Sequence, residues 1–269
     1  MSPLSEAQLG AIQARYVAHA DEGWEADPNG PFELRPLGLA DASGGALGAI
    51  RLRATANGGT SPWSTSDADL EAIYVLRGEL IVDGADGQRT ELGPNDVIAR
   101  TRGAASRIAA RSPDFEGIAV SARGEAEAPA SDPAGKLLVA RDAPEASVLG
   151  AGPRPEVIYR DLGVAEATGG AYRLWVVKSS QPATDMSIWH YHDMAQWFVV
   201  LDGWAHIEVN GHDPVEVRPG DALCIGAGPA MRHNVSDIGE GFTILELCAP
   251  AEYGTWPGEP GVRPAENAA

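Results

Sequence analysis

The chain's most informative stretch reads Trp189-His190-Tyr191-His192-Asp193-Met194-Ala195-Gln196-Trp197-Phe198-Val199-Val200. Side chains two positions apart on a strand share one face, and their Cα atoms lie about 6.5–7 Å apart. Two imidazoles at this spacing can converge on one metal ion. Gln196 has the same parity as His190 and His192, so a regular strand directs its amide to the same face. The stretch therefore predicts a strand that presents metal ligands on one side.

A second stretch supplies a third nitrogen donor. It reads Pro219-Gly220-Asp221-Ala222-Leu223-Cys224-Ile225-Gly226, and Gly228-Pro229-Ala230-Met231-Arg232-His233-Asn234-Val235 follows. Turn residues bracket a short apolar strand, so His233 is expected on a following strand that folds back toward the first one. We expect this histidine to join His190 and His192 as a ligand of a divalent metal ion.

These residues resemble the two motifs of the cupin superfamily. The first motif is His-x-His, a carboxylate a few residues on, and a glycine; here Gln196 stands where glutamate is usual, and Gly203 matches the glycine. The second motif is Pro-Gly-Asp, a Pro/Gly turn and a histidine, with about two extra residues before His233. The resemblance implies an all-β fold of two tandem cupin barrels (jelly rolls, or double-stranded β-helices) with a short N-terminal helix. The 32 glycines and 20 prolines also favour many short strands.

The two halves of the chain repeat at a fixed offset of 125 residues. Val75-Leu76-Arg77-Gly78 lies over Val200-Leu201-Asp202-Gly203, and Gly93-Pro94-Asn95-Asp96 lies over Arg218-Pro219-Gly220-Asp221. The matches fall at turns, where backbone geometry restricts the residue type. We interpret them as a duplicated β unit; the alternative is a chance similarity of two turn-rich stretches.

The same offset predicts that the first barrel lacks the metal site. The residues that correspond to His190, His192, Gln196 and His233 are Thr65, Asp67, Glu71 and Ile108. The isoleucine suggests an apolar filling, and we expect a structural role, either packing against the second barrel or shaping a dimer interface. The two carboxylates could bind a hard cation, although carboxylates in a turn-rich stretch are usually solvated.

The composition shifts along the chain predict its organisation. Ser5 and Gln8 can form a capping box that opens a helix over 5–20, with Leu9, Ile12 and Tyr16 on one face. Residues 136–140 are the one expected strand in a linker rich in Ala, Pro, Ser, Asp and Gly. The predicted units are 1–45 (N-terminal helix and lead-in), 46–121 (degenerate cupin), 122–165 (linker), 166–256 (metal-binding cupin) and 257–269 (tail).

The net charge and the number of cysteines limit which classes of partner the protein is expected to have. The chain has 20 basic and 38 acidic residues, a net charge of −18, which repels nucleic acids and anionic membrane surfaces. No apolar run approaches about 18 residues, and no signal-peptide pattern is present. Two cysteines make no disulfide framework. We therefore expect a cytoplasmic protein that acts on a small molecule and binds neither nucleic acid nor membrane.

Several further side chains are candidates for substrate contacts. Arg173 and Arg232 could grip a substrate carboxylate or phenolate through the guanidinium fork, with an outward ion pair as the alternative for Arg232. Gln196 either ligates the metal or hydrogen-bonds a bound water, the substrate or a ligand histidine. Trp175 could line the barrel mouth. His206 and His212 are expected to face solvent.

The ligand set favours particular chemistry. Three neutral imidazoles leave the metal its full charge and open positions, which suits an anionic substrate beside dioxygen on Fe(II), while Mn, Zn or Ni are also possible. The resemblance to three-histidine cupins of the gentisate type implies a dioxygenase that acts on a small anionic substrate, which can be aromatic. One alternative is a non-redox lyase, isomerase or hydrolase, as in bicupins similar to ureidoglycine aminohydrolase. Another is a non-catalytic cupin that binds a small ligand. Because bicupins commonly pair, we expect a homodimer.

Overall fold

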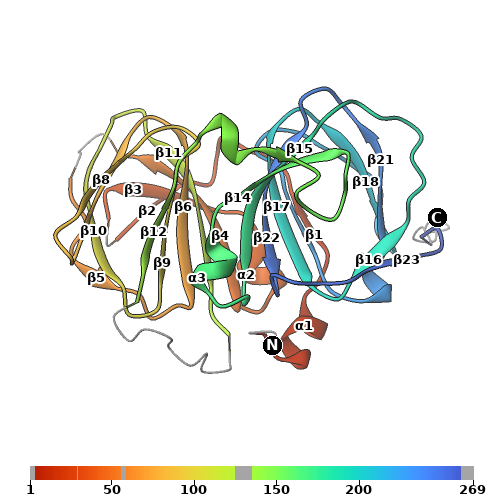
Figure 1. The fold of residues 1–269 in the computed structure, drawn as a ribbon, viewed down its shortest axis with the longest axis horizontal. Helices are drawn as coiled ribbons and strands as arrows, with labels where there is room; N and C mark the ends of the chain where they lie inside the picture. Colours follow the sequence, from red (N-terminus) through yellow and green to blue (C-terminus); the bar gives the residue numbers. More distant parts are fainter. Residues whose placement is uncertain (1–3, 29, 56–58, 125–134, 262–269) are drawn as a thin grey trace.

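Two β-barrels lie side by side in the computed structural model, which describes residues 4–28, 30–55, 59–124 and 135–261 (Figure 1). Short antiparallel strands dominate both barrels, and the α-helices are brief: α1 (Glu6–Ala11), α2 (Leu39–Ala42) and α3 (Val164–Ala167). The predicted all-β architecture of two tandem barrels with a short N-terminal helix is confirmed. No helix in these described ranges is long and apolar enough to cross a membrane.

The first barrel consists of a seven-stranded sheet, ordered β12-β9-β6-β11-β4-β3-β2, and a four-stranded sheet, ordered β5-β10-β7-β8. The strands are β2 (Glu25–Ala26), β3 (Phe32–Pro36), β4 (Leu47–Ala54), β5 (Ser64–Thr65), β6 (Leu70–Arg77), β7 (Leu80–Gly84), β8 (Arg89–Leu92), β9 (Val97–Thr101), β10 (Ala105–Arg111), β11 (Glu116–Ala122) and β12 (Leu137–Ala140).

The second barrel repeats this plan with a seven-stranded sheet, ordered β1-β20-β17-β22-β15-β14-β13, and a five-stranded sheet, ordered β19-β18-β21-β16-β23. The strands are β1 (Arg15–Val17), β13 (Val148–Leu149), β14 (Val157–Asp161), β15 (Arg173–Ser179), β16 (His190–His192), β17 (Ala195–Asp202), β18 (Ala205–Val209), β19 (Val215–Val217), β20 (Ala222–Ile225), β21 (His233–Ile238), β22 (Thr243–Ala249) and β23 (Thr255–Pro257).

Equivalent turns in the two barrels have the same backbone conformation. Gly78 and Gly203 both have positive φ, +72° and +68°, and both lie against the backbone of a phenylalanine. A Cβ at Gly78 would come within 2.8 Å of Phe115, and one at Gly203 within 2.5 Å of Phe242. Both turns therefore require glycine, which supports the interpretation of a duplicated unit.

Successive side chains of a strand point to opposite faces of the sheet, so the side chains of one strand contribute alternately to two hydrophobic cores. On β17, Trp197 and Val199 face the other barrel, whereas Phe198 and Val200 face the barrel interior. The large sheets of the two barrels pack face to face through one continuous core. A second hydrophobic cluster lies inside the first barrel, and a third lies inside the second barrel.

The N-terminal helix is shorter than predicted. The capping box forms as expected, with Gln8 N–H donating to Ser5 Oγ and Ser5 N–H donating to Gln8 Oε1. The helix ends at Ala11, not at residue 20, and Ile12 is fully buried in the core between the barrels. Tyr16 lies on β1, which pairs with β20. Strand pairing with a distant partner has overridden the local helical pattern.

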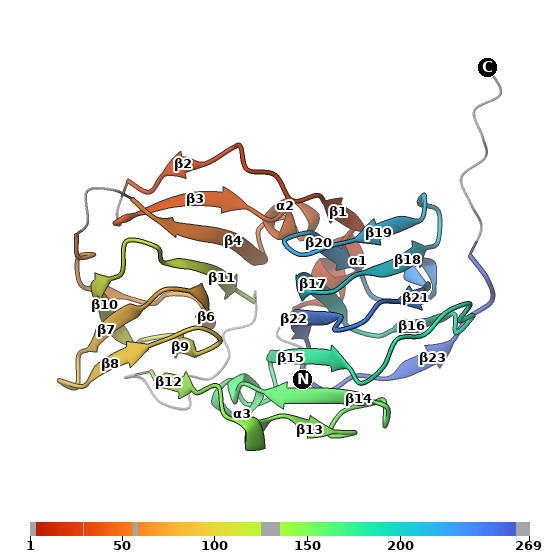
Figure 2. The same cartoon turned by 90° about the horizontal axis from the view of Figure 1, so that it is seen from above.

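The segments predicted as lead-in and linker contribute strands to both barrels (Figure 2). In the lead-in, β1 joins the second barrel, while β2 and β3 join the first. In the linker, the expected strand at 136–140 forms as β12 in the first barrel, and β13 and β14 extend the second. The segment predicted as a tail begins within β23, and residues 262–269 lie outside the described ranges.

Candidate metal centre

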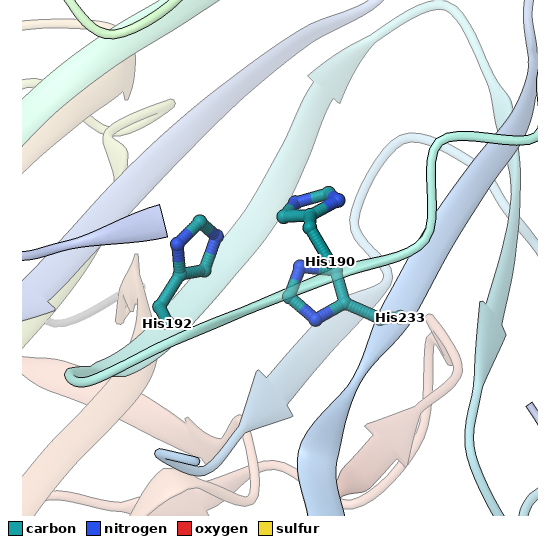
Figure 3. Close-up of side chains that lie close together, drawn as sticks. All are labelled: His190, His192 and His233. Carbon is teal, nitrogen blue, oxygen red and sulfur yellow. The ribbon is translucent and has the colours of Figure 1, made fainter. Parts of the chain in front are cut away.

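Three histidines meet inside the second barrel (Figure 3). His190 and His192 lie two apart on β16, so both rings point to the barrel interior, and His233 begins β21 directly opposite His190 in the antiparallel register. All three side chains are buried, and their ligand nitrogens lie within 4.8 Å of one another. The structure therefore brings together the three predicted ligands.

Neighbouring groups fix the orientation of each ring. His190 Nδ1 lies 2.8 Å from the Ile188 carbonyl, and His233 Nδ1 lies 3.1 Å from the Met231 carbonyl. Since a carbonyl only accepts hydrogen bonds, both Nδ1 atoms carry the proton, so the lone pair of each of these two rings is on Nε2. His192 Nδ1 lies 3.0 Å from Thr255 Oγ1. Such outer hydrogen bonds hold metal-ligating imidazoles in place.

Burial keeps the three imidazoles neutral. It lowers the pKa of His233 to about 3 and the pKa of His192 to about 4, and the neighbouring histidines reinforce both shifts. Burial also lowers the pKa of His190. A protonated imidazole cannot bind a cation, so these shifts leave all three nitrogens available at neutral pH.

A buried hydrogen-bond network lies next to the histidines. Glu246 on β22 accepts one bond from Gln196 Nε2 and another from Trp175 Nε1. Burial raises the pKa of Glu246, and the two donors oppose that rise. Gln196 Oε1 is buried and has no hydrogen-bond partner among the described residues. The sequence reasoning missed Glu246, although a carboxylate inside the apolar run of 243–249 is a visible signal.

The histidines line a cavity of about 200 Å³. Its walls are largely apolar and aromatic, and its polar lining includes Gln196, Glu246 and Arg154. The Nη2 atom of Arg154 lies 3.4 Å from His190 Nε2. Arg154 belongs to the segment predicted as a linker, and nothing in its local sequence indicated a place at the site. Trp175, which was expected at the barrel mouth, lines the cavity as a buried side chain that donates to Glu246.

The two arginines predicted to contact substrate lie elsewhere. Arg173 donates to the Ala251 carbonyl, forms an ion pair with Asp161 and lies 4.9 Å from the Trp175 ring. Arg232 donates to the Pro229 carbonyl. Neither guanidinium is part of the cavity lining, and Arg154 is the cation that the structure places there.

The donor set fits a divalent metal ion. The imidazole nitrogens line the same cavity as the Gln196 oxygen, which is buried and has no hydrogen-bond partner among the described residues, and a buried electron-pair donor of this kind is costly unless a cation satisfies it. Imidazole is a good ligand for Fe, Zn, Ni and Cu. His190, His192 and His233 could therefore bind a metal in the cavity that Gln196 also lines.

The first barrel has no equivalent cluster. Asp67 is exposed and pairs with Arg123 at 2.6 Å, while Glu71 pairs with Arg100 at 2.8 Å. Within the described ranges, the three histidines are the only group of three or more His, Cys, Asp or Glu side chains close enough to share an ion.

Comparison with known proteins supports this assignment of the second barrel. Residues 177–247 match the family model of the cupin domain. No curated protein matches the chain in sequence. Solved structures with the same fold include protein Ylba from E. coli (12% identity, TM-score 0.68, 90% of this chain and 93% of that one). A second is a glyoxylate-induced protein from Pseudomonas aeruginosa, with 15% identity and a TM-score of 0.69 over 94% of this chain and 92% of that one. A third is oxalate decarboxylase from Bacillus subtilis, with 15% identity and a TM-score of 0.59 over 90% of this chain and 78% of that one.

Proposed function

We propose that this cupin-fold protein is an Fe(II)-dependent dioxygenase that acts on a small anionic molecule. The observation that carries the proposal is the set of three buried, neutral histidines that line one cavity. His190, His192 and His233 would hold the metal, and Gln196, which lines the same cavity, would offer its Oε1 as a further oxygen donor. When bound, iron would supply the one-electron chemistry that dioxygen requires.

The cavity itself suggests the substrate class. Its volume of about 200 Å³ is below the range of about 300–1,000 Å³ that is typical of pockets for drug-sized ligands. The guanidinium of Arg154 can donate two parallel hydrogen bonds to a carboxylate or bind a phenolate. Phe198, Ile207 and Ile244 provide apolar walls that exclude water from the bound molecule. These features support a small anion with an apolar body.

A second candidate, non-redox metal catalysis, is favoured by Glu246. Its carboxylate lines the same cavity as the histidines, held by Gln196 and Trp175. A lyase, isomerase or hydrolase needs a group that accepts or donates a proton close to the substrate, and this carboxylate occupies such a position. Manganese is then a reasonable metal: the structurally similar oxalate decarboxylase has Mn(II) centres.

Metal content tests the site. Protein purified without added metal should contain about one ion per chain, and His192→Ala should lose most of it. The matched control is His212→Ala, which removes an exposed imidazole from the turn after β18. Equal metal content in both variants would show that the site is misplaced. Wild-type protein free of metal, with unchanged stability in chelator, would favour the non-catalytic ligand-binding alternative.

Oxygen uptake separates the two enzymatic candidates. The iron-loaded protein is incubated with a panel of catechols, hydroxybenzoates and diketones while dissolved oxygen and substrate are followed together. Consumption of one oxygen molecule per substrate molecule supports the dioxygenase. Conversion of a substrate without oxygen uptake supports Lewis-acid catalysis and overturns the first candidate.

A further inference from the structure

The first barrel encloses a cavity of about 560 Å³, larger than the cavity at the histidines. The two cavities are built from corresponding positions of the repeat. Six residues that line the first are Ile50, Glu71, Ile73, Ile108, Ala119 and Ser121. The residues 125 positions later all line the second: Trp175, Gln196, Phe198, His233, Ile244 and Glu246. The first cavity is therefore the structural counterpart of the candidate metal site.

Smaller side chains explain its greater volume. Ile50 stands where the second barrel has Trp175, and Ser121 stands where it has Glu246. Ile108, which was expected to fill the space left by a lost histidine, lines the cavity but does not close it. The first barrel has the predicted apolar filling, with Ile108 packed against its hydrophobic cluster, but this filling is incomplete and an open volume remains where the second barrel has its histidines. Pockets of this size accommodate drug-sized ligands.

One ion pair forms the polar centre of this cavity. Arg100 Nε donates to Glu71 Oε2 at 2.8 Å, and Arg100 Nη1 donates to Ser106 Oγ at 3.2 Å and to the Ser64 hydroxyl and carbonyl at 3.0 and 3.1 Å. The guanidinium is therefore held by four acceptors. Positive and negative charge lie side by side at this point of the lining.

The other charged residues of the lining are also paired. Arg107 donates twice to Asp83 Oδ2, at 3.0 and 2.8 Å, and Asp41 forms an ion pair with Arg15 at 3.0 Å. A charged ligand would find its attraction to one member of a pair offset by repulsion from the other, and it would lose hydration on entering the apolar cavity. The lining thus favours an uncharged molecule.

We infer that the first barrel binds a neutral, mostly apolar small molecule through a hydroxyl or amide head at the Glu71–Arg100 pair. Such a head both donates and accepts hydrogen bonds, so it can donate to the Glu71 carboxylate and accept from the Arg100 guanidinium. The aliphatic side chains of Ile50, Ile73 and Ile108 contact the apolar body. This site lies in a different barrel from the candidate metal centre.

Calorimetric titration of the full chain with matched ligands tests this inference. The ligands are 4-butylphenol, which is uncharged at pH 7, and 4-butylbenzoate, which carries a carboxylate of similar size. At the site that Ile50→Trp blocks, found by subtracting the titration of this variant from that of the wild type, the phenol should bind with a dissociation constant at least about tenfold lower than that of the benzoate, a difference of about 1.4 kcal/mol. Ile50→Trp, which introduces the side chain found in the second barrel, should abolish phenol binding.

A second variant keeps the test decisive if Ile50→Trp does not fold. Glu71→Gln leaves Arg100 without its carboxylate, so the benzoate should bind about tenfold more tightly than to the wild type. The control, Glu33→Gln, makes the same change in the Arg53–Glu33 pair, which does not line the cavity. Absence of phenol binding, or binding that neither Ile50→Trp nor Glu71→Gln alters, would overturn the inference. Metal content is measured alongside, because it reports on the second barrel alone.

Discussion

The hydroxyl of Thr255 fixes the orientation of His192 in the candidate site. It lies 3.0 Å from His192 Nδ1 and comes from β23, which pairs with the histidine strand β16. The other two rings are held by backbone carbonyls of residues two positions before them, 188 and 231. His192 is therefore the ligand whose orientation depends on a side chain that can be changed without altering the backbone.

Thr255→Val should weaken metal binding without removing a ligand. Valine has the same shape as threonine but cannot hydrogen-bond His192, and loss of such outer contacts typically lowers metal affinity by about 10–100-fold. Competition with a chromogenic chelator measures the dissociation constant. Thr243→Val is the control, because that hydroxyl bonds only the Gly241 carbonyl at a distant turn. Equal affinities in the two variants would show that the Thr255 contact does not support the site.

The predictability of the site varies from residue to residue. His190 and His192 could be predicted because strand parity alone places them on one face, and His233 because its turn resembles a known motif. Glu246 carries a signal, a single charge within a buried apolar strand. Arg154 carries none, because its position depends on how a chain segment of the predicted linker folds over the barrel.

At the scale of elements, His206 links three strands of the five-stranded sheet. From β18, its imidazole lies 2.9 Å from Glu216 on β19 and 3.2 Å from Asp237 on β21. Hydrogen bonds to Asp237 and Glu216 raise the pKa of His206 above its ordinary value of 6.5. The sequence predicted a solvent-facing histidine, and the side chain is indeed partly exposed, but its carboxylate partners depend on the strand order.

The His206 pairs should make stability depend on pH. Because the folded-state pKa is raised, the contribution is fully present below the unfolded-state pKa of about 6.5 and is lost as the pH rises through the folded-state pKa. NMR titration should give His206 a pKa above 6.5, and Asp237→Asn should lower it. The urea midpoint of the wild type should fall relative to His206→Gln as the pH rises above 6.5. A His206 pKa at or below 6.5 would contradict this expectation.

The strand β1 shows why some elements could not be predicted. Locally, residues 5–20 have the apolar spacing of a helix, and only the first turn and a half adopts it. Beyond it, Tyr16 Oη and His19 N–H both donate to the buried carboxylate of Asp221, at 3.0 and 2.6 Å. That carboxylate lies about 200 residues away in the Pro-Gly-Asp turn, so a helical pattern read locally cannot reveal the contact.

At the scale of the whole molecule, the duplication was readable from the turns, but the packing of the repeats was not. The outward faces of both large sheets are apolar, so each barrel alone would expose a sheet of hydrophobic side chains. The two faces cover each other, and Tyr172 Oη donates to Asp69 Oδ2 at 3.1 Å across the buried contact. The first barrel therefore stabilises the second, whatever ligand it binds itself.

This shared core predicts that the two barrels unfold as one unit. Trp197 is 1% exposed and lies in the core between the barrels, so Trp197→Ala should lower the free energy of unfolding by about 3–5 kcal/mol. Trp63→Ala is the control, because that side chain is 50% exposed and makes one cation–π contact with Arg107, so its loss should cost about 1 kcal/mol or less.

Urea denaturation followed by circular dichroism measures both variants, and the wild type should show one cooperative transition. Two separate transitions in the wild type, or equal losses in the two variants, would show that the barrels are stable independently. In that case the first barrel would not be needed for the fold of the metal centre. Ligand binding in its cavity would then be the one role left for the first barrel.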